Sequence, residues 1–377
     1  MTQETAKPRR RWTLGVAAVV AVLLVAAGAV VAARRLSWST PAPGPTAGPA
    51  TPTASASASS PAPAPASPTP PPGADLTGPL NFLIVGVDTR VTVPGWEPHA
   101  DAVLVMHVDA GLKQAYLFSL PRDLVVDIPA YPKAGYPGGR TKLTHAMSYG
   151  SRVPGDKAHP STAQGYELLR TTVSRYTGLR IDAGAVLTFF GFDRLVDALG
   201  GVDLYVDQRV ASIHRRPDGQ YRPHTAGGYT GPQMVYEKGN RHLNGWQARD
   251  YARQRYIAGG DYARQRHQQQ LIRALIRKIL GQGLARDPDR VEQVVRTLGK
   301  TMVYTGGGRR LVDFAYALGG MPADGLVLVG LPGDAVGKGG AYRGEQLRPV
   351  GRQFLAELRA GHAEQFLKTH PTLRVRT

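Results

Sequence analysis

The hexapeptide Asp-Tyr-Ala-Arg-Gln-Arg occurs twice in this chain, at residues 250–255 and 261–266. The two copies place four arginines and two aspartates in one short window. Guanidinium groups keep their charge at physiological pH and present forked donors that match phosphate oxygens. The window therefore predicts a site for a phosphate or pyrophosphate group. The alternative is a helix face whose basic side chains are simply solvated.

Two aspartates outside this window predict a metal site. Asp88 and Asp101 lie on opposite sides of a loop between two predicted strands, near the edge of a sheet where α/β proteins commonly bind ligands. Mg²⁺ favours few protein carboxylates together with substrate phosphates and water. We therefore predict that Asp88 and Asp101 hold Mg²⁺. The alternative is that Asp88 caps a turn and Asp101 pairs with a lysine.

Arg122 follows a predicted strand and adds one guanidinium at a similar sheet edge.

Other catalytic patterns are missing from the sequence. His107, His145 and His267 lack the spacing of metal ligands, and there is no Ser-His-Asp order and no Walker-type glycine loop. The chain has no cysteine, which excludes disulfides and thiol catalysis.

The elements that must position these residues alternate along the chain. Buried strands are predicted from apolar runs at 81–87, 102–108, 115–119, 202–206 and 326–331. Helices are predicted at 162–176, 192–199 and 347–358. Strand runs without polar alternation are typical of a sheet that helices cover on both faces. The pattern predicts a layered α/β fold.

The two hexapeptides are predicted to flank a glycine turn. Asn244, followed by a glutamine three residues later, is a good helix N-cap. Arg253 and Arg255 would diverge by about 200° on an ideal helix, so binding of one ligand by both requires the helix to loosen near Arg253. Two glycines at 259–260 then break the chain, and apolar residues within 271–279 predict a further helix.

The N-terminal part predicts a membrane anchor and a linker. Residues 14–33 are uncharged and long enough to cross about 30 Å of hydrocarbon as a helix. Basic residues are denser before this span than after it, which predicts a cytoplasmic N-terminus at 1–13 and an extracellular remainder. The alternative is a cleaved signal peptide. Residues 34–78, rich in Pro, Ala, Ser and Thr, predict a disordered extracellular linker.

The remaining chain predicts one large catalytic domain at 79–362 and a C-terminal tail at 363–377. The net charge is +18 for the whole chain, and 40 of 46 basic and 26 of 28 acidic residues lie within 79–377, which leaves +14 there. We therefore expect an anionic partner. For a domain outside the membrane, lipid phosphates and wall polymers fit this charge better than nucleic acid.

Seven ordered sequence blocks, spread over about 190 residues, resemble the LytR-CpsA-Psr family. The predicted anchor, linker and extracellular domain correspond to this family as well. The blocks are Gly86-Val-Asp-Thr-Arg90, Ala100-Asp101, Ser119-Leu-Pro-Arg-Asp123, Lys142-Leu143, and the matching positions within 191–203, 243–255 and 260–268.

The resemblance implies a fold and an activity. The fold would be an α/β/α sandwich with a central mixed sheet and an apolar tunnel for a lipid chain. The activity would be that of a Mg²⁺-dependent phosphotransferase, with polyprenyl pyrophosphatase activity as a side reaction. It would move a glycopolymer from a polyprenyl pyrophosphate carrier to peptidoglycan, typically to the C6 hydroxyl of N-acetylmuramic acid, through a phosphodiester bond. Teichoic acid, capsule and arabinogalactan all remain open as the polymer.

The resemblance also implies roles for individual residues. Asp88 and Asp101 would bind or orient the metal, and one of them would serve as the general base. The pyrophosphate would be clamped by Arg90, Arg122, Arg253 and Arg255, with Lys142 assisting. Asp261, Arg264 and Gln268 would line or brace the same site.

At three positions the chain departs from the family pattern. His99 and His267 stand where the family usually has arginines, and Thr144 stands where asparagine is common. Each histidine replaces a permanent charge by a titratable one. Arg266 lies one residue before His267, which raises the question whether its guanidinium reaches the site.

Two alternative functions remain open at this point. The chain could bind or tether polyprenyl-linked glycan or anionic wall polymer without turning it over. A transcriptional regulator is less favoured, because the predicted topology keeps the domain away from DNA.

Overall fold

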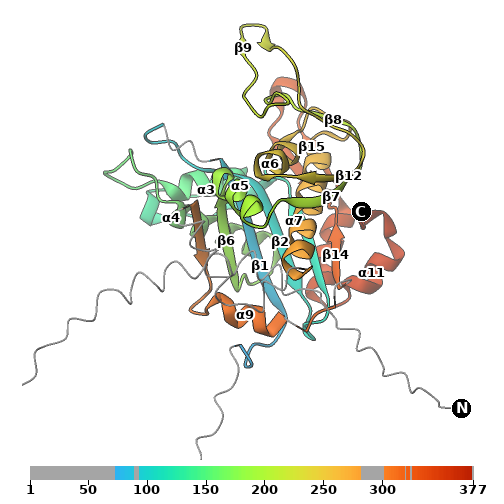
Figure 1. Ribbon diagram of the computed structural model, residues 1–377. Helices are drawn as coiled ribbons and strands as arrows, with labels where there is room; N and C mark the ends of the chain where they lie inside the picture. The colour runs from blue at the N-terminus through green and yellow to red at the C-terminus, as the bar shows by residue number, and fades with distance from the viewer. Residues whose placement is uncertain (1–72, 89–92, 282–300, 319, 323–324, 376–377) are drawn as a thin grey trace, which may run out of the picture.

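The computed structural model describes residues 73–88, 93–281, 301–318, 320–322 and 325–375 (Figure 1). The predicted N-terminal segment 1–13, the predicted membrane span 14–33 and most of the predicted linker lie outside these residues. Among the described residues, no helix has the length and apolar character needed to cross a membrane.

A six-stranded mixed sheet forms the centre of the fold, in the order β13-β6-β1-β2-β3-β14. β1 (Leu80–Asp88) pairs antiparallel with β2 (His99–Val108) and parallel with β6 (Ala183–Thr188). β2 continues antiparallel to β3 (Ala115–Leu120), which pairs parallel with β14 (Leu326–Val329). β13 (Met302–Thr305) lies antiparallel to β6 at the other edge. Both strand orientations occur, which confirms the predicted mixed sheet.

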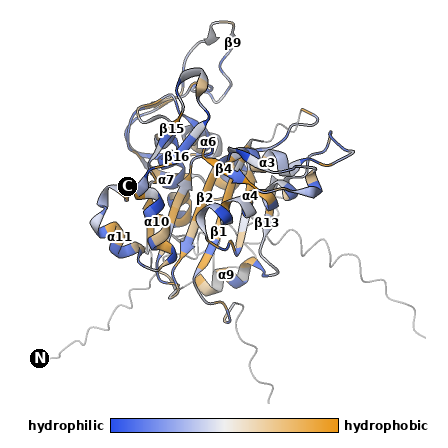
Figure 2. Ribbon diagram, turned by 180° about the vertical axis from the view of Figure 1, so that it is seen from behind, coloured by the Kyte–Doolittle hydropathy of each residue, from blue (hydrophilic) through white to orange (hydrophobic). Residues whose placement is uncertain are grey.

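Helices cover both faces of this sheet. One face packs against α5 (Phe189–Ala198), α6 (Gly245–Arg253), α7 (Gly260–Gly281) and α9 (Leu311–Leu318). The other face packs against α3 (Thr144–Ser151), α4 (Thr162–Thr177), α10 (Pro349–Arg359) and α11 (Ala363–Thr369). Phe82 and Ile84 of β1 join the first core, whereas Leu83 and Val85 join the second. Because both faces are buried, the central strands are mostly apolar (Figure 2).

Short two-stranded sheets surround this sandwich. They are β4 (Val125–Ile128) with β5 (Gly139–Lys142), β7 (Val202–Val206) with β12 (Gly239–Leu243), and β15 (Gly333–Val336) with β16 (Gly344–Leu347). Single 3-10 turns lie at η1 (Pro132–Ala134), η4 (Gly339–Ala341) and η5 (Pro371–Leu373). The predicted strand at 202–206 does form, but it pairs with β12 outside the central sheet.

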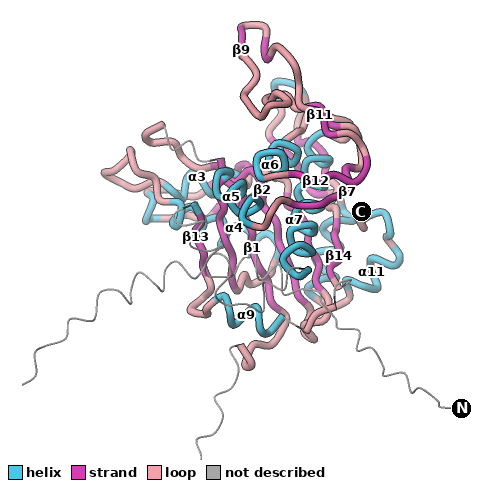
Figure 3. Tube along the Cα trace, in the orientation of Figure 1, coloured by secondary structure: helices cyan, strands magenta, loops and turns pink. Residues whose placement is uncertain are grey.

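An excursion between β7 and β12 projects from the body, and we call residues 207–238 the arm. It contains β8 (Val210–Ala211) paired with β11 (Val235–Tyr236), and β9 (His224–Thr225) paired with β10 (Gly228–Tyr229). Figure 3 shows β9 near the tip of the arm, beyond α6 and the end of the central sheet. No sequence pattern predicted this excursion.

The predicted break between the two hexapeptides is confirmed. Asn244 and Gln247 form a reciprocal capping box at the start of α6. The helix ends at Arg253, and Gln254 has extended backbone angles of φ −69° and ψ 123°. α7 follows Gly259, whose φ of +89° lies in the region that favours glycine. Arg255 therefore leaves the helical path that would have turned it away from Arg253.

The predicted boundary at residue 362 is wrong. Gly361 resembles a terminator because it adopts a left-handed φ of +79° after α10, yet the chain continues into α11. Phe366 and Leu367 of this helix are buried in the second core, and the Phe366 ring lies 6.4 Å from that of Phe354. Leu373 is buried as well. The folded domain thus extends through most of the predicted tail.

We predict that Leu367→Ala lowers the free energy of unfolding by about 2–5 kcal/mol, because Leu367 has no exposed side-chain surface and its removal leaves a cavity. Thermal unfolding followed by circular dichroism measures the effect. The neighbouring exposed Lys368→Ala is the matched control and should unfold like the wild type. Equal midpoints for the two variants would restore the view that residues 363–377 are a tail.

Candidate functional site

Asp101 is the centre of a network at the edge of the sheet. Arg122 Nη1 donates to Asp101 Oδ1 at 2.6 Å, and Arg264 Nη1 donates to the Asp101 carbonyl at 2.8 Å. Arg264 is buried and is itself held by Asp261, which accepts from Arg264 Nε at 2.9 Å. Burial acts to lower the pKa of Arg122, but the attraction of Asp101 outweighs it and the pKa is raised. The partner of Asp101 is thus an arginine and not the lysine that the alternative prediction named.

Lys142 lies beside this network on β5. Its ammonium is 3.4 Å from Asp123 Oδ1 and 4.8 Å from the centre of the Tyr342 ring. The Tyr342 hydroxyl donates to the other oxygen of Asp123 at 3.3 Å. Asp123 and Asp261 both raise the pKa of Arg122, so these three charged groups lie in one neighbourhood, and Lys142 joins them through Asp123.

Glu345 is a site residue that the sequence analysis missed. Its carboxylate accepts a hydrogen bond of 2.6 Å from the Tyr262 hydroxyl. Burial raises the pKa of Glu345, and the negative charges of Asp261 and Asp123 act in the same direction. Glu345 lies in β16, a segment that carries no sequence motif. A β-bridge to Leu124, just before β4, brings Glu345 close to the Asp101 network, and no local sequence signal predicts this bridge.

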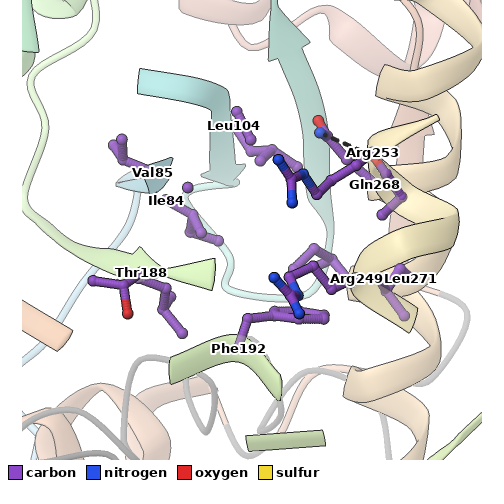
Figure 4. Close-up of a pocket in the computed structure, with 14 residues that line it drawn as sticks. Ile84, Val85, Leu104, Thr188, Phe192, Arg249, Arg253, Gln268 and Leu271 are labelled. Carbon is purple, nitrogen blue, oxygen red and sulfur yellow. Dashed lines mark hydrogen bonds between the residues drawn. The ribbon is translucent and has the colours of Figure 1, made fainter. Parts of the chain in front are cut away.

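An apolar cavity opens next to the arginine-rich end of α6 (Figure 4). Its apolar walls come from β1, β2, β6, α5 and α7. The polar lining residues include Arg249, Arg253 and Gln268, and Figure 4 shows the guanidinium groups of both arginines directed into the cavity. Arg249 is also bound to Asp193 at 2.8 Å, and Gln268 donates to the Ala252 carbonyl at 3.4 Å. The cavity combines an apolar chamber with cationic groups.

Arg255 is exposed and lies close to an exposed tyrosine. Its Nη2 donates to the Tyr256 hydroxyl at 3.3 Å. Burial lowers the pKa of His214 in the arm, and the positive charges of Arg253 and Arg255 lower it further. Arg253 and Arg255 therefore share one neighbourhood, as the prediction of a joint clamp requires, and His214 is a further member that no motif indicated.

The second hexapeptide copy is used differently. Arg266 Nε donates to Asp207 at 2.6 Å, and His267 Nε2 lies 3.0 Å from the other oxygen of Asp207. The His267 ring is fully buried and stacks on Tyr251 at 4.3 Å. Burial acts to raise the pKa of Asp207, but hydrogen bonds from His267 and Arg266 hold it well below its usual value. Asp207 holds Arg266 at the base of the arm, so its guanidinium does not take the place of a site arginine.

The aspartates that begin the two hexapeptides also have different roles. Asp250 is buried and accepts hydrogen bonds from Ser212 at 3.0 Å and from Tyr236 at 2.9 Å. Asp261, its counterpart, braces Arg264 at the site. Equal sequence therefore does not mean equal role in these two segments.

The metal prediction concerns residues that the structure describes only in part. Arg90 lies outside the described residues, and Asp88 is described for its backbone alone. The strand register sets Asp88 opposite His99, two residues from Asp101, so both aspartates belong to the same end of adjacent strands. Among the described side chains, no group of three or more His, Cys, Asp and Glu is arranged to hold a metal. A site with two carboxylates completed by substrate phosphate is compatible with this arrangement and stays a prediction.

Comparison with known proteins decides the family. The model of the LytR_cpsA_psr family matches residues 51–345. The chain belongs to this family. It is 27% identical over 205 residues to the regulatory protein MsrR of Staphylococcus aureus (strain COL), which covers 54% of this chain and 50% of MsrR. It is 28% identical over 203 residues to the polyisoprenyl-teichoic acid–peptidoglycan teichoic acid transferase TagU of Enterococcus faecalis, covering 54% of each chain. The match spans about half the length of these curated relatives.

Solved structures share the fold of this LytR_cpsA_psr family member. The crystal structure of B. subtilis TagV superposes with a TM-score of 0.54 at 19% identity and covers 76% of this chain and 98% of that chain. TagT bound to LI-WTA superposes with a TM-score of 0.53 at 22% identity, over 75% of this chain and 90% of that chain. At this level of identity the agreement establishes the fold.

We predict that Asp207→Asn destabilises the domain by about 1–3 kcal/mol near neutral pH, because Arg266 and the buried His267 lose their charged acceptor. The pKa of Asp207 is lowered by folding, so its contribution is present above about pH 4 and is lost as the pH falls below that value. Denaturant unfolding of both proteins at several pH values tests this. The deficit should shrink under acid conditions.

The control for this prediction is Asp218→Asn, which alters an exposed aspartate paired with Arg216 at 2.8 Å. A surface ion pair contributes little, so this variant should stay within about 0.5 kcal/mol of the wild type. A pH-independent deficit in Asp207→Asn would contradict the assigned ion pair.

Proposed function

We propose that this chain is a phosphotransferase that attaches a polyprenyl-pyrophosphate-linked glycopolymer to peptidoglycan through a phosphodiester bond. Membership of the LytR_cpsA_psr family supports this proposal. So does the similarity to a protein named as a teichoic acid transferase, and to TagT, which was solved with LI-WTA bound. The predicted span at 14–33 would anchor the chain, with its N-terminus in the cytoplasm and its domain outside.

The observation that carries the proposal is the apolar cavity beside Arg253 and the Asp101 network. A polyprenyl pyrophosphate joins a long apolar chain to two phosphates, and the site offers an apolar chamber next to clustered guanidinium groups. A soluble phosphoester would not need the apolar chamber, and a lipid without phosphate would not need the guanidinium groups. The cavity therefore fits the donor that the family resemblance implies.

The proposed reaction is an in-line displacement at phosphorus. The acceptor hydroxyl oxygen bonds to the phosphorus that carries the glycan, the bond from this phosphorus to the polyprenyl phosphate oxygen breaks, and polyprenyl phosphate leaves. Such transfer depends on positioning and on neutralising oxygen charge more than on covalent help. Arg253, Arg255 and Arg90 would neutralise the pyrophosphate, with Lys142 assisting.

The remaining residues would position these groups. Asp261 holds Arg264, Arg264 holds the backbone of Asp101, and Arg122 binds the Asp101 carboxylate. Mg²⁺, which Asp88 and Asp101 would hold, would supply further charge at the phosphates. Because Arg122 engages Asp101, we assign the acceptance of the hydroxyl proton to Asp88. Gln268 would border the entrance to the apolar chamber.

The experiment that tests the function uses the full chain in detergent with Mg²⁺, peptidoglycan and a polyprenyl-pyrophosphate-linked glycan. We expect release of polyprenyl phosphate together with a peptidoglycan fragment that carries a phosphodiester-linked glycan, both detected by mass spectrometry. Binding of the donor without either product would instead favour the tether. Running candidate glycans in parallel would identify the polymer.

We predict that Arg255→Ala lowers the rate of this transfer by about 100-fold or more, because it removes a guanidinium that would neutralise the pyrophosphate. The fold should persist, because Arg255 is exposed and has no part in the core. The matched control is Arg309→Ala, which removes an exposed arginine that pairs with Asp75. Its transfer rate should equal that of the wild type. An undiminished rate in Arg255→Ala would remove Arg255 from the clamp.

A further inference from the structure

Five aromatic rings form a continuous row beside the Asp101 network. Trp96 and His99 have ring centres 6.4 Å apart, and His99 lies 6.3 Å from His145. His145 lies 5.3 Å from Tyr149, which lies 4.9 Å from Tyr136. All five side chains are partly exposed. They come from the segment before β2, from the first residue of β2, from α3 and from the loop between β4 and β5, so the fold and not local sequence assembles the row.

An ion pair links two parts of the row, and polar groups lie beside its rings. Arg152, at the end of α3, donates to both carboxylate oxygens of Glu97 at 2.7 and 3.2 Å. This ion pair ties the segment with Trp96 and His99 to α3, and the Arg152 guanidinium lies 4.4 Å from the centre of the Tyr149 ring. Thr141 Oγ1 is 2.9 Å from His145 Nδ1. Partly exposed aromatic groups flanked by donors and acceptors are suited to sugar rings, which present C–H faces and rims of hydroxyl groups.

The row lies on the opposite side of the site from the cavity. The cavity is formed on the face covered by α5, α6 and α7, whereas α3 belongs to the other face. Thr141, which contacts His145, directly precedes Lys142 on β5, and Lys142 pairs with Asp123. Both charged groups therefore adjoin the row, and both affect the pKa of His145. The proposed phosphate-binding edge thus lies between the cavity and the aromatic row.

This placement matters for the direction of the reaction. In phosphoryl transfer the attacking and leaving oxygens lie roughly in line across the phosphorus. If the polyprenyl phosphate leaves toward the cavity, the incoming hydroxyl must approach from the side of the aromatic row. The molecule that carries that hydroxyl is the acceptor, whose backbone is a chain of sugar rings.

We propose that Trp96, His99, His145, Tyr149 and Tyr136 form a platform that binds a glycan strand of peptidoglycan and aligns its hydroxyl for attack. This inference rests on the proposed function, because it takes the cavity to be the leaving-group side. It adds a binding surface for the acceptor that is separate from the arginines and aspartates of the donor site.

The test measures binding of fluorescently labelled soluble peptidoglycan strands, free of lipid and of wall polymer, to the full chain in detergent micelles. Trp96→Leu and Tyr136→Leu alter opposite ends of the row, and each should weaken binding by about tenfold in fluorescence anisotropy. Trp96→Phe and Tyr136→Phe retain a ring and should stay within about threefold. The control Tyr176→Leu changes a partly buried tyrosine on α4, away from the row, and should bind like the wild type.

Release of polyprenyl phosphate to water, measured without acceptor, separates a defect in acceptor binding from a defect in the donor chemistry. The leucine variants should release it at the wild-type rate. Normal release with unchanged strand binding in both variants would overturn the platform, and absence of release from the wild type both without acceptor and with peptidoglycan would overturn the proposed function instead. Weaker binding of the free glycopolymer, with strand binding unchanged, would also overturn the assignment to the acceptor.

A measurement on the wild type covers the case in which a variant fails to fold. Hydrogen–deuterium exchange with and without strands should show slower exchange in residues 93–99 and 131–152, and no change at the arm. Protection confined to the arm would contradict the platform.

Discussion

The hydrogen-bonded chain from Asp261 through Arg264 to Asp101 and Arg122 is the interaction on which the site depends. It joins the start of α7, the start of β2 and the turn after β3, three segments that are distant in sequence. Arg264 is buried, and a buried guanidinium is tolerated only when its donors are occupied. Because Asp261 and the Asp101 carbonyl occupy them, α7 is fixed against the edge of the sheet. The cavity wall on α7 and the proposed phosphate-binding edge are thereby held in one geometry.

This constraint organises the two faces of the sandwich. On one face α6 and α7 enclose an apolar chamber whose polar lining comes from arginines and a glutamine. On the other face α3 presents an aromatic row. A donor with a lipid tail and an acceptor built of sugars need such different surfaces, and the edge of the sheet is where they can meet. The charged network lies between the two.

The sequence predicted the central elements well because their signals are local. Apolar runs predicted β1, β2, β3 and β14. Asn244 predicted the start of α6, and Gly259 predicted the break before α7. Pairing across long separations could not be predicted in this way. Glu345 reaches the site through β16, His214 through the arm, and β7 pairs with β12 instead of the central sheet. The family resemblance assigned different residues in the two hexapeptides, Arg253 and Arg255 in the first and Asp261 and Arg264 in the second. The structure adds that Asp250 is a core acceptor, whereas Asp261 braces Arg264. α11 was missed because Gly361 ends α10, and a glycine that ends one helix does not show whether another helix follows.

The central claim is that the lipid of the donor occupies the cavity between the sheet and α7. Photo-crosslinking tests it most directly, with a polyprenyl-pyrophosphate-linked glycan that carries a photoreactive group in its apolar tail. After irradiation and digestion of the full chain, we expect mass spectrometry to find the label on lining residues such as Phe192, Leu271 and Ile272. Label confined to α10 and α11 on the opposite face would contradict the account.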